Sequence, residues 1–213
     1  MTQSIPLFAG ISPDELDKML ACLSGKTRFY AKSEVILAMG EPTASLGLLV
    51  EGAVQIVRED IWGNRQVLQV IAAGDLFGES YACLPGEPLL VSAVAADPCQ
   101  VLFLQVARVM TTCPASCPFH NRLARNLLTL LARKNLTLTR KIDHVSQRTI
   151  REKVLRYLGD QALLQGERSF EIPLNRQELA DYLAVDRSAL SAELSRMQGE
   201  GLIAYRRSRF TLL

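Results

Sequence analysis

The chain has 213 residues, of which 48% are hydrophobic and 22% are charged, and its formal net charge is +2. This length allows two domains with apolar cores, while so small a net charge indicates no particular partner. The odd number of cysteines, five, argues against a secreted disulfide framework and favours reduced thiols in the cytoplasm. The start of the chain lacks a signal-peptide pattern and the apolar runs are interrupted, so no membrane partner is expected.

The front of the chain opens with a helix signal and continues as strands. Ser12 to Glu15 form a capping box with proline at the first helical position. Short apolar runs then alternate with turns rich in Gly, Pro, Asn and Asp, which predicts a series of strands. These runs cover residues 46–52, 53–59, 65–71, 91–96 and 100–106. Many short strands in succession predict a small barrel or sandwich.

A long amphipathic helix is expected next, over residues 113–145. Its apolar residues recur at heptad spacing, with an asparagine at one core position, which is typical of a coiled-coil seam between two chains. The seam residues that we assign to a dimer interface are Ala124, Leu128, Leu131, Asn135, Leu138 and Ile142. The alternative is a core helix within one subunit.

Three potential ligands lie at the start of this helix. Cys113, Cys117 and His120 are spaced i, i+4 and i+7, so a continuous helix would place them on one face, as a metal or redox site requires. Pro114 and Pro118 can interrupt that face, and buried cysteines are common structural residues. A purely structural role is therefore the alternative.

Two short helices separated only by Ala184 and Val185 follow in the C-terminal part. Asn175 and Asp186 are suitable N-caps, and the apolar residues of each helix fall on one side. This pattern is typical of a helix-turn-helix, whose second helix enters the DNA major groove, although an ordinary helical pair is the alternative. The outer face of the second helix carries small, hydroxyl and basic residues: Ser188, Ser191, Ala192, Ser195 and Arg196.

The chain ends in a short hairpin with a basic tip. Gly201 marks a turn, and two short apolar runs flank Arg206, Arg207 and Arg209. Such a wing suits contact with DNA phosphates. Residues 146–213 are therefore expected to form a winged helix-turn-helix domain that binds DNA.

The order of these parts resembles the Crp–Fnr family of bacterial transcription regulators. "GLLVEGAVQIV" (Gly47–Val57) and "GDLFGES" (Gly74–Ser80) are similar to the cyclic-nucleotide-binding β-roll, and the winged helix follows in the family's order. The resemblance implies an α+β fold with three parts. These are an effector-sensing antiparallel β-roll, or double-stranded β-helix, over residues 1–112, a long dimerisation helix over 113–145 and the winged helix-turn-helix over 146–213.

The resemblance also implies an effector pocket, but with altered chemistry. In members that bind cyclic nucleotides, a Gly-Glu pair precedes an Arg and a Ser or Thr that hold the cyclic phosphate. Gly78 and Glu79 match the pair, whereas leucines occupy the other two positions, and residues 66–107 contain no Arg or Lys. The expected pocket residues are Gly78, Glu79, Leu89, Leu90, Leu128 and Leu131. Cyclic AMP is therefore not expected as the effector.

The DNA contacts that the resemblance implies are also altered. Arg176 and Gln177 match family positions that touch phosphates, and Arg187 matches the first base-contacting position. Ser188 and Ala192 stand where the family often has Glu and Arg, so the operator sequence should differ.

We therefore predict a homodimeric, sequence-specific transcription regulator. Its partners would be an inverted-repeat operator in double-stranded DNA, an effector in or near the roll and, if it is an activator, RNA polymerase. One alternative is a thiol- or metal-responsive regulator, and another is a small-molecule-binding module with a degenerate DNA-binding domain. An enzyme is disfavoured, because the only histidines are His120 and His144 and no nucleophile–base set is evident.

Overall fold

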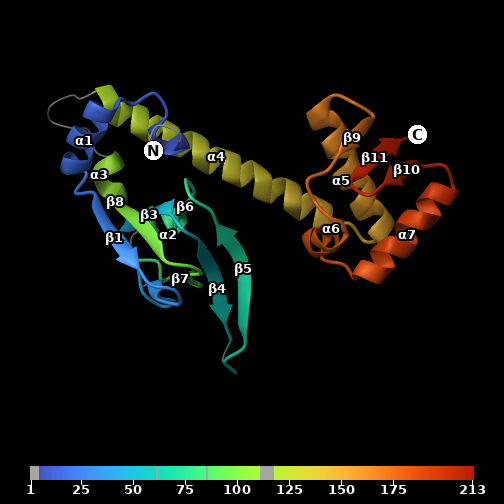
Figure 1. Cartoon of the computed structure of the whole chain (residues 1–213), viewed down its shortest axis with the longest axis horizontal. Helices are drawn as coiled ribbons and strands as arrows, with labels where there is room; N and C mark the ends of the chain where they lie inside the picture. Colours follow the sequence, from blue (N-terminus) through green and yellow to red (C-terminus); the bar gives the residue numbers. More distant parts are fainter. Residues whose placement is uncertain (1–4, 61, 85, 111–117) are drawn as a thin grey trace. The chain divides into compact units, whose positions relative to one another are not determined.

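The computed structural model describes residues 5–60, 62–84, 86–110 and 118–213, and the chain divides into two compact units, Met1–Leu131 and Ala132–Leu213 (Figure 1). The long helix α4 (Pro118–Ser146) contributes its first half to one unit and its second half to the other. The sequence-based division instead treats this helix as a segment of its own. Within the described ranges, every helix is too short or too polar to cross a membrane.

The N-terminal unit is built around two four-stranded antiparallel sheets. One has the order β1-β8-β3-β6, with β1 at Lys26–Tyr30, β8 at Cys99–Gln105, β3 at Ser45–Glu51 and β6 at Leu76–Phe77. The other has the order β2-β7-β4-β5, with β2 at Val35–Leu37, β7 at Ser92–Ala95, β4 at Val54–Glu59 and β5 at Arg65–Ile71. The five strands predicted from apolar runs correspond to β3, β4, β5, β7 and β8, which confirms the antiparallel roll.

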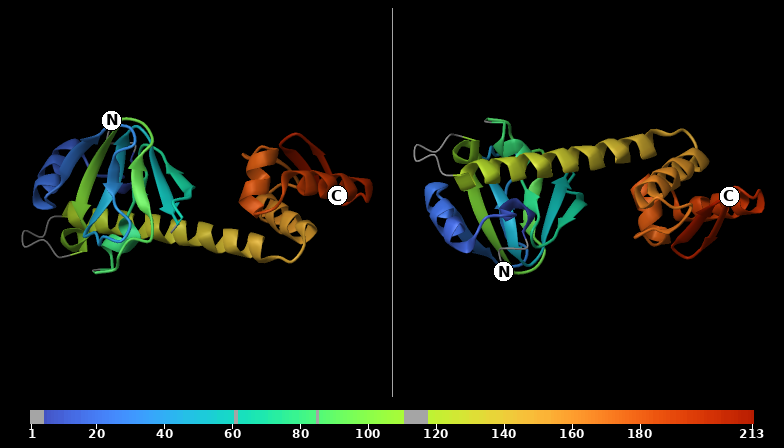
Figure 2. Two further views of the ribbon diagram at one scale, coloured as in Figure 1. Left: turned by 90° about the horizontal axis from the view of Figure 1, so that it is seen from below. Right: turned by 90° about the horizontal axis from the view of Figure 1, so that it is seen from above.

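Side-chain alternation along the strands gives this unit two cores. Leu49, Val54 and Val101 belong to the core between the two sheets. Residues of the opposite strand faces, such as Leu48, pack instead against a layer of helices that includes Leu123 of α4. That layer consists of the short helix η2 (Pro6–Phe8), α1 (Pro13–Cys22), α3 (Val106–Met110) and the start of α4 (Figure 2).

The predicted capping box of α1 is confirmed. The Ser12 hydroxyl accepts a hydrogen bond from the Glu15 N–H, and the Glu15 carboxylate accepts one from the Ser12 N–H at 2.9 Å. These contacts satisfy two amide groups that the first turn of a helix leaves without partners. The helix therefore begins where the local sequence places it.

The C-terminal unit is a winged helix-turn-helix. Helices α5 (Ile150–Gln165), α6 (Arg176–Leu183) and α7 (Arg187–Gly199) accompany a three-stranded sheet of order β10-β11-β9. Its strands are β10 at Ile203–Arg206, β11 at Arg209–Leu212 and β9 at Ser169–Glu171. One core joins all of them, including Leu158, Leu194 and Phe210.

The break before this domain lies later than the sequence suggests. The sequence ends the long helix at residue 145 and begins the next part at 146, whereas α4 stays helical through Ser146. The next helix begins at Ile150 because the Thr149 hydroxyl accepts a hydrogen bond from the Glu152 N–H and the Glu152 carboxylate accepts one from the Thr149 N–H. The capping box at Thr149, rather than the polar residues before it, sets the boundary.

Candidate functional site

The corner between α6 and α7 is closed by backbone and capping contacts. The Asn175 carboxamide oxygen accepts hydrogen bonds from the N–H groups of Gln177 and Glu178 at 2.9 and 3.0 Å. Ala184 ends α6 in the left-handed region with φ 51°, and the Val185 N–H donates to the Ala180 carbonyl at 3.0 Å. Asp186 then caps α7 through the Ala189 N–H. Only Ala184, Val185 and the N-cap Asp186 therefore lie between the two helices, close to the two-residue separation that the sequence predicts.

Burial fixes which face of α7 points outward. Leu190, Leu194 and Met197 are fully buried in the domain core. On the opposite side, the residues that the structure leaves exposed are Arg187, Ser188, Ala192, Ser195 and Arg196, with Ser191 half-buried. This exposed face is the one that the sequence assigns to DNA.

The side chains of this face differ in the hydrogen bonds and ion pairs that they form within the chain. The Ser191 and Ser195 hydroxyls donate to the carbonyls of Arg187 and Ser191 at 2.9 and 3.0 Å, and the Ser188 hydroxyl donates to Asp186. Arg196 forms an ion pair with Glu193 at 2.8 Å. Arg187 has no carboxylate partner among the described residues, so it is the free cation of this face.

A clamp behind α7 was not anticipated from the sequence. The Arg151 guanidinium of α5 donates to the buried Glu193 at 2.7 Å and to both carboxylate oxygens of Glu200 at 2.8 Å. These hydrogen bonds lower the pKa of Glu200 and raise that of Arg151. The clamp joins residues more than forty positions apart, so no local pattern could reveal it.

The wing presents three exposed arginines. Arg206 and Arg209 pair across β10 and β11, and Arg207 lies at the tip with φ 56°. The Ser208 hydroxyl donates to Glu171 at 2.6 Å and its carbonyl accepts from the Ile172 N–H at 2.9 Å, which ties the tip to β9. Because the backbone is held, the arginines project from a defined turn.

Arg176 and Gln177, which the resemblance assigns to phosphate contacts, lie at the start of α6. The Arg176 guanidinium stacks 4.9 Å from the ring centre of Tyr205 and 5.7 Å from that of Phe210, both in the wing. Partial burial there lowers its pKa. The Gln177 amide donates to Asp181 at 2.9 Å. Arg176 therefore also holds the wing against α6.

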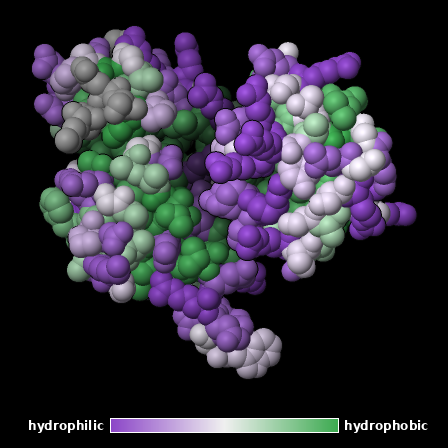
Figure 3. All heavy atoms as spheres, turned by 45° about the vertical axis from the view of Figure 1, so that its right-hand side comes forward, coloured by the Kyte–Doolittle hydropathy of each residue, from purple (hydrophilic) through white to green (hydrophobic). Residues whose placement is uncertain are grey.

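The predicted seam residues of α4 divide between two environments. Ala124 and Leu131 pack partly against the core of the N-terminal unit, beside the buried Leu123 and Leu127. Leu128, Leu138 and Ile142 are instead 60–67% exposed, and Asn135 is exposed on the same helix. Hydrophobic side chains also cover a broad area of the N-terminal unit on the face drawn in Figure 3.

A buried histidine fixes the end of α4 within the C-terminal unit. His144 is 2% exposed, and its Nε2 donates to Asp160 of α5 while its Nδ1 lies 3.0 Å from the Tyr182 hydroxyl of α6. Burial raises the pKa of Tyr182 and raises that of the adjacent Tyr157 to about 12. The imidazole ring of His144 thus links the end of α4 to α5 and α6.

The residues expected around an effector are separated. Leu89 is buried and Leu90 is 63% exposed, and both line a surface groove that also includes Trp62 of the β4–β5 hairpin. Gly78 and the buried Glu79 open the short helix α2 (Glu79–Ala82) and do not line that groove. Leu128 and Leu131 of α4 do not line it either.

The candidate metal or thiol site is described only in part. Cys113 and Cys117 lie outside the described residues. His120 is 6% exposed, and neither of its ring nitrogens has a hydrogen-bond partner among the residues that the structure describes. Such an orphaned buried imidazole is unusual, because buried polar atoms are generally satisfied.

Comparisons with known proteins agree with this architecture. A model of the cyclic nucleotide-binding domain matches residues 27–113, and a model of the Crp-like helix-turn-helix domain matches residues 152–213. The cyclic AMP receptor protein of Thermus thermophilus is 28% identical over 93% of this chain and 88% of its own. The transcriptional regulator LdrP of the same organism is 30% identical over 84% and 88%.

Solved structures share the fold. The catabolite activator protein of Thermus thermophilus superimposes with a TM-score of 0.56, at 27% identity over 98% of this chain and 93% of its own. CprK in complex with OCPA gives a TM-score of 0.63 at 17% identity, over 92% of this chain and 88% of its own.

Proposed function

Since the chain belongs to the Crp–Fnr family of bacterial transcription regulators, we propose that it acts as a cytoplasmic homodimer that binds an inverted-repeat operator and answers to an effector of the roll. The observation that carries this proposal is the outer face of α7 together with the wing. Arg187 of α7 and the three wing arginines have no carboxylate partner among the described residues, and the side of α7 opposite this face is buried.

The roles of these arginines follow from their positions. Arg187 begins α7, and the N-terminal residues of a recognition helix reach base edges in the major groove. Arg206, Arg207 and Arg209 project from the wing, where they would neutralise phosphates without reading sequence. Gln177 would assist from the start of α6, while the serines and Ala192 would allow close approach to the bases.

Dimerisation is supported by the exposed stripe of α4. Leu128, Leu138 and Ile142 leave large apolar surfaces in water, and burying one leucine side chain contributes roughly 1.5–3 kcal/mol. Asn135 between them suits a coiled-coil position that fixes register. A second copy of the same helix is the partner whose pattern matches this stripe. RNA polymerase would be a further partner if the protein is an activator.

Selection from random DNA duplexes tests the proposal. We expect recovery of a palindromic motif with half-sites centred about 34 Å apart, one helical turn, as a two-fold dimer requires. Failure to recover any palindrome, with or without oxidant, would overturn it and favour a small-molecule-binding module with a degenerate DNA-binding domain.

The effector is proposed to differ from cyclic AMP. Leu89 and Leu90 stand at the phosphate-binding positions, and residues 66–107 supply no cation in their place. Desolvating a phosphate there without a charged partner costs several kcal/mol, about 4 of which would weaken a micromolar site to a millimolar one. Calorimetry with cyclic AMP checks this, and a low-micromolar dissociation constant would contradict it.

A thiol- or metal-responsive regulator is a second candidate. The ring nitrogens of the buried His120, which have no partner in the described part of the chain, favour it, because a metal would satisfy one of them. Cys113 and Cys117 would supply thiolates. If so, purified protein should carry near-stoichiometric metal, or oxidant should change its DNA binding, and Cys113→Ser with Cys117→Ser should abolish that response. Metal-free protein whose binding ignores oxidant would exclude this candidate.

A further inference from the structure

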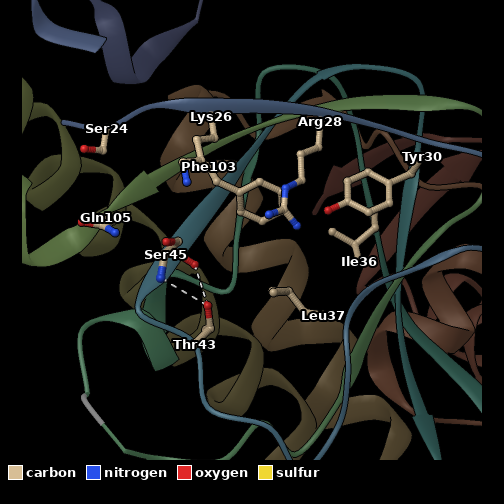
Figure 4. Close-up of a pocket in the computed structure, with 10 residues that line it drawn as sticks. All are labelled: Ser24, Lys26, Arg28, Tyr30, Ile36, Leu37, Thr43, Ser45, Phe103 and Gln105. Carbon is tan, nitrogen blue, oxygen red and sulfur yellow. Dashed lines mark hydrogen bonds between the residues drawn. The ribbon is translucent and has the colours of Figure 1, made fainter. Parts of the chain in front are cut away.

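A cavity of about 250 Å³ opens in the N-terminal unit against the inner face of the sheet that contains β1, β3 and β8 (Figure 4). Strand β1 contributes its basic and aromatic side chains, and β2 and β8 contribute apolar ones. Its lining includes Lys26, Arg28, Tyr30, Ile36, Leu37 and Phe103. The volume lies just below the range typical of ligand pockets, so it suits only a small molecule.

The strand register explains how two cations reach this cavity. Lys26, Arg28 and Tyr30 alternate along β1 and therefore share one face. Lys26 pairs with Phe103 of β8 across the sheet. The Arg28 guanidinium lies 6.0 Å from the centre of the Phe103 ring, and Tyr30 meets the same ring edge-on at 6.4 Å. In Figure 4 the Arg28 guanidinium and the Tyr30 hydroxyl point toward one another.

The positive charges of Lys26 and Arg28 are not paired with carboxylates of the described residues. None of its lining residues is acidic. Within the described part of the chain, neither Lys26 nor Arg28 forms an ion pair, and the Tyr30 hydroxyl makes no hydrogen bond. Two like charges two residues apart on one strand repel each other. An anion between them would relieve that repulsion and accept charge-assisted hydrogen bonds from both.

The other wall of the cavity is apolar. Leu37 and Ile36 line it opposite the cations, and Phe103 offers a ring face. Leu37 also closes the side toward α2, because a Cβ placed on Gly78 would lie 2.9 Å from a Leu37 methyl group. The cavity is therefore distinct from the Gly78–Leu90 segment, where the family resemblance placed an effector. Its cations come from β1 and therefore lie outside residues 66–107, which contain no Arg or Lys.

From these observations we propose that the cavity binds a small organic acid. Lys26 and Arg28 hold its carboxylate with help from the Tyr30 hydroxyl, and its apolar or aromatic body packs between Phe103 and Leu37. The binding of this acid does not depend on the proposed function. Its role as the effector of DNA binding does rest on the proposed function.

Calorimetry on the full chain tests the site with matched pairs of probes. Benzoate and hexanoate carry the charge, benzamide and hexanamide keep the shape without it, and inorganic phosphate carries charge without an apolar body. We expect at least one acid to bind about tenfold or more tightly than its amide and than phosphate. Equal affinities for acid and amide, phosphate binding as tight as that of the acids, or no binding by any acid would overturn the proposal.

Variants assign the binding to this cavity. Arg28→Gln should weaken the acid about tenfold or more, Arg28→Lys should recover part of the loss, and Lys26→Gln should act in the same direction as Arg28→Gln. Lys18→Gln, which removes an exposed charge of α1 outside the cavity, should change nothing. Thermal melting confirms that each variant is folded. Unchanged affinity in folded Arg28→Gln would overturn the assignment.

Operator binding measured on the same proteins separates the two proposals. If the chain binds a palindromic operator but no acid, the anion site is wrong and the proposed function stands. If it binds an acid through Arg28 but no operator, the site stands and the proposed function is wrong.

Discussion

We expect Arg187 to contact bases and the wing arginines to contact phosphates, so substitutions at the two places should have different effects. Arg187→Ala should relax preference at one position of each half-site, a loss of about 1–3 kcal/mol of discrimination, if Arg187 makes the bidentate base contact that we propose for it. Arg206→Ala with Arg207→Ala should instead weaken binding to all sequences and reduce the salt dependence by roughly one to two phosphate contacts. Titration of selected and scrambled duplexes at several salt concentrations measures both. Identical effects of the two variants would contradict this division of roles.

Glu200 makes the stability of the C-terminal unit sensitive to acid. Its pKa is lowered first by the hydrogen bonds from Arg151, so the folded state prefers the ionised carboxylate. The stabilisation is fully present above the ordinary glutamate pKa of about 4.3 and is lost as the pH falls through the lower folded value. Thermal melting of wild type and Glu200→Gln should therefore differ at neutral pH and converge in acid. A difference that persists in acid would show that Glu200 acts in some other way.

At the scale of elements, the sequence predicts those helix boundaries that depend on contacts within a single helical turn. Ser12, Asn175 and Asp186 cap helices through contacts within three positions, so their patterns are sufficient. The Arg151 clamp and the cavity beside β1 depend on partners far along the chain. Arg28 faces Phe103 only because β1 pairs with β8, and no property of either segment alone specifies that register. Sequence reasoning therefore found the recognition helix and missed both the clamp and the cavity.

The exposed stripe of α4 makes the clearest prediction for an element. Leu138→Asp should convert dimers to monomers that no longer bind the operator, because a carboxylate would replace an apolar contact at the seam. The substitution should leave the fold intact, since Leu138 is 60% exposed. Leu163→Asp on α5, where the leucine is 83% exposed, is the matched control and should stay dimeric. Sedimentation of both variants decides, and a dimeric Leu138→Asp would show that this stripe is not the interface.

A substitution of Asn135, the polar residue of the seam, should strengthen the dimer, whereas Leu138→Asp should weaken it. Asn135→Leu is expected to strengthen the dimer, since an asparagine at such a position fixes register at a cost in stability. The dissociation constant of the dimer, measured by sedimentation at several protein concentrations, should fall. A rise would place Asn135 outside the seam.

At the scale of the whole molecule, the chain has separate cores in its two compact units, Met1–Leu131 and Ala132–Leu213. A substitution in one core should therefore not propagate to the other. Leu48→Ala and Leu194→Ala each remove a fully buried leucine, one in each unit, and each should cost about 2–5 kcal/mol through lost burial and the cavity left behind. A substitution in α4 would affect both units, because this helix contributes to both. Leu48 and Leu194 were chosen because they lie outside α4.

Scanning calorimetry should resolve two transitions in the wild-type protein. Leu48→Ala should lower one of them and Leu194→Ala the other, and operator binding by Leu194→Ala should fail at the temperature where its own transition begins. Two units that unfold separately can transmit a signal only through elements they share, and α4 is such an element. If both substitutions instead lower a single common transition by the same amount, the chain unfolds as one cooperative body and the division into independent units is wrong.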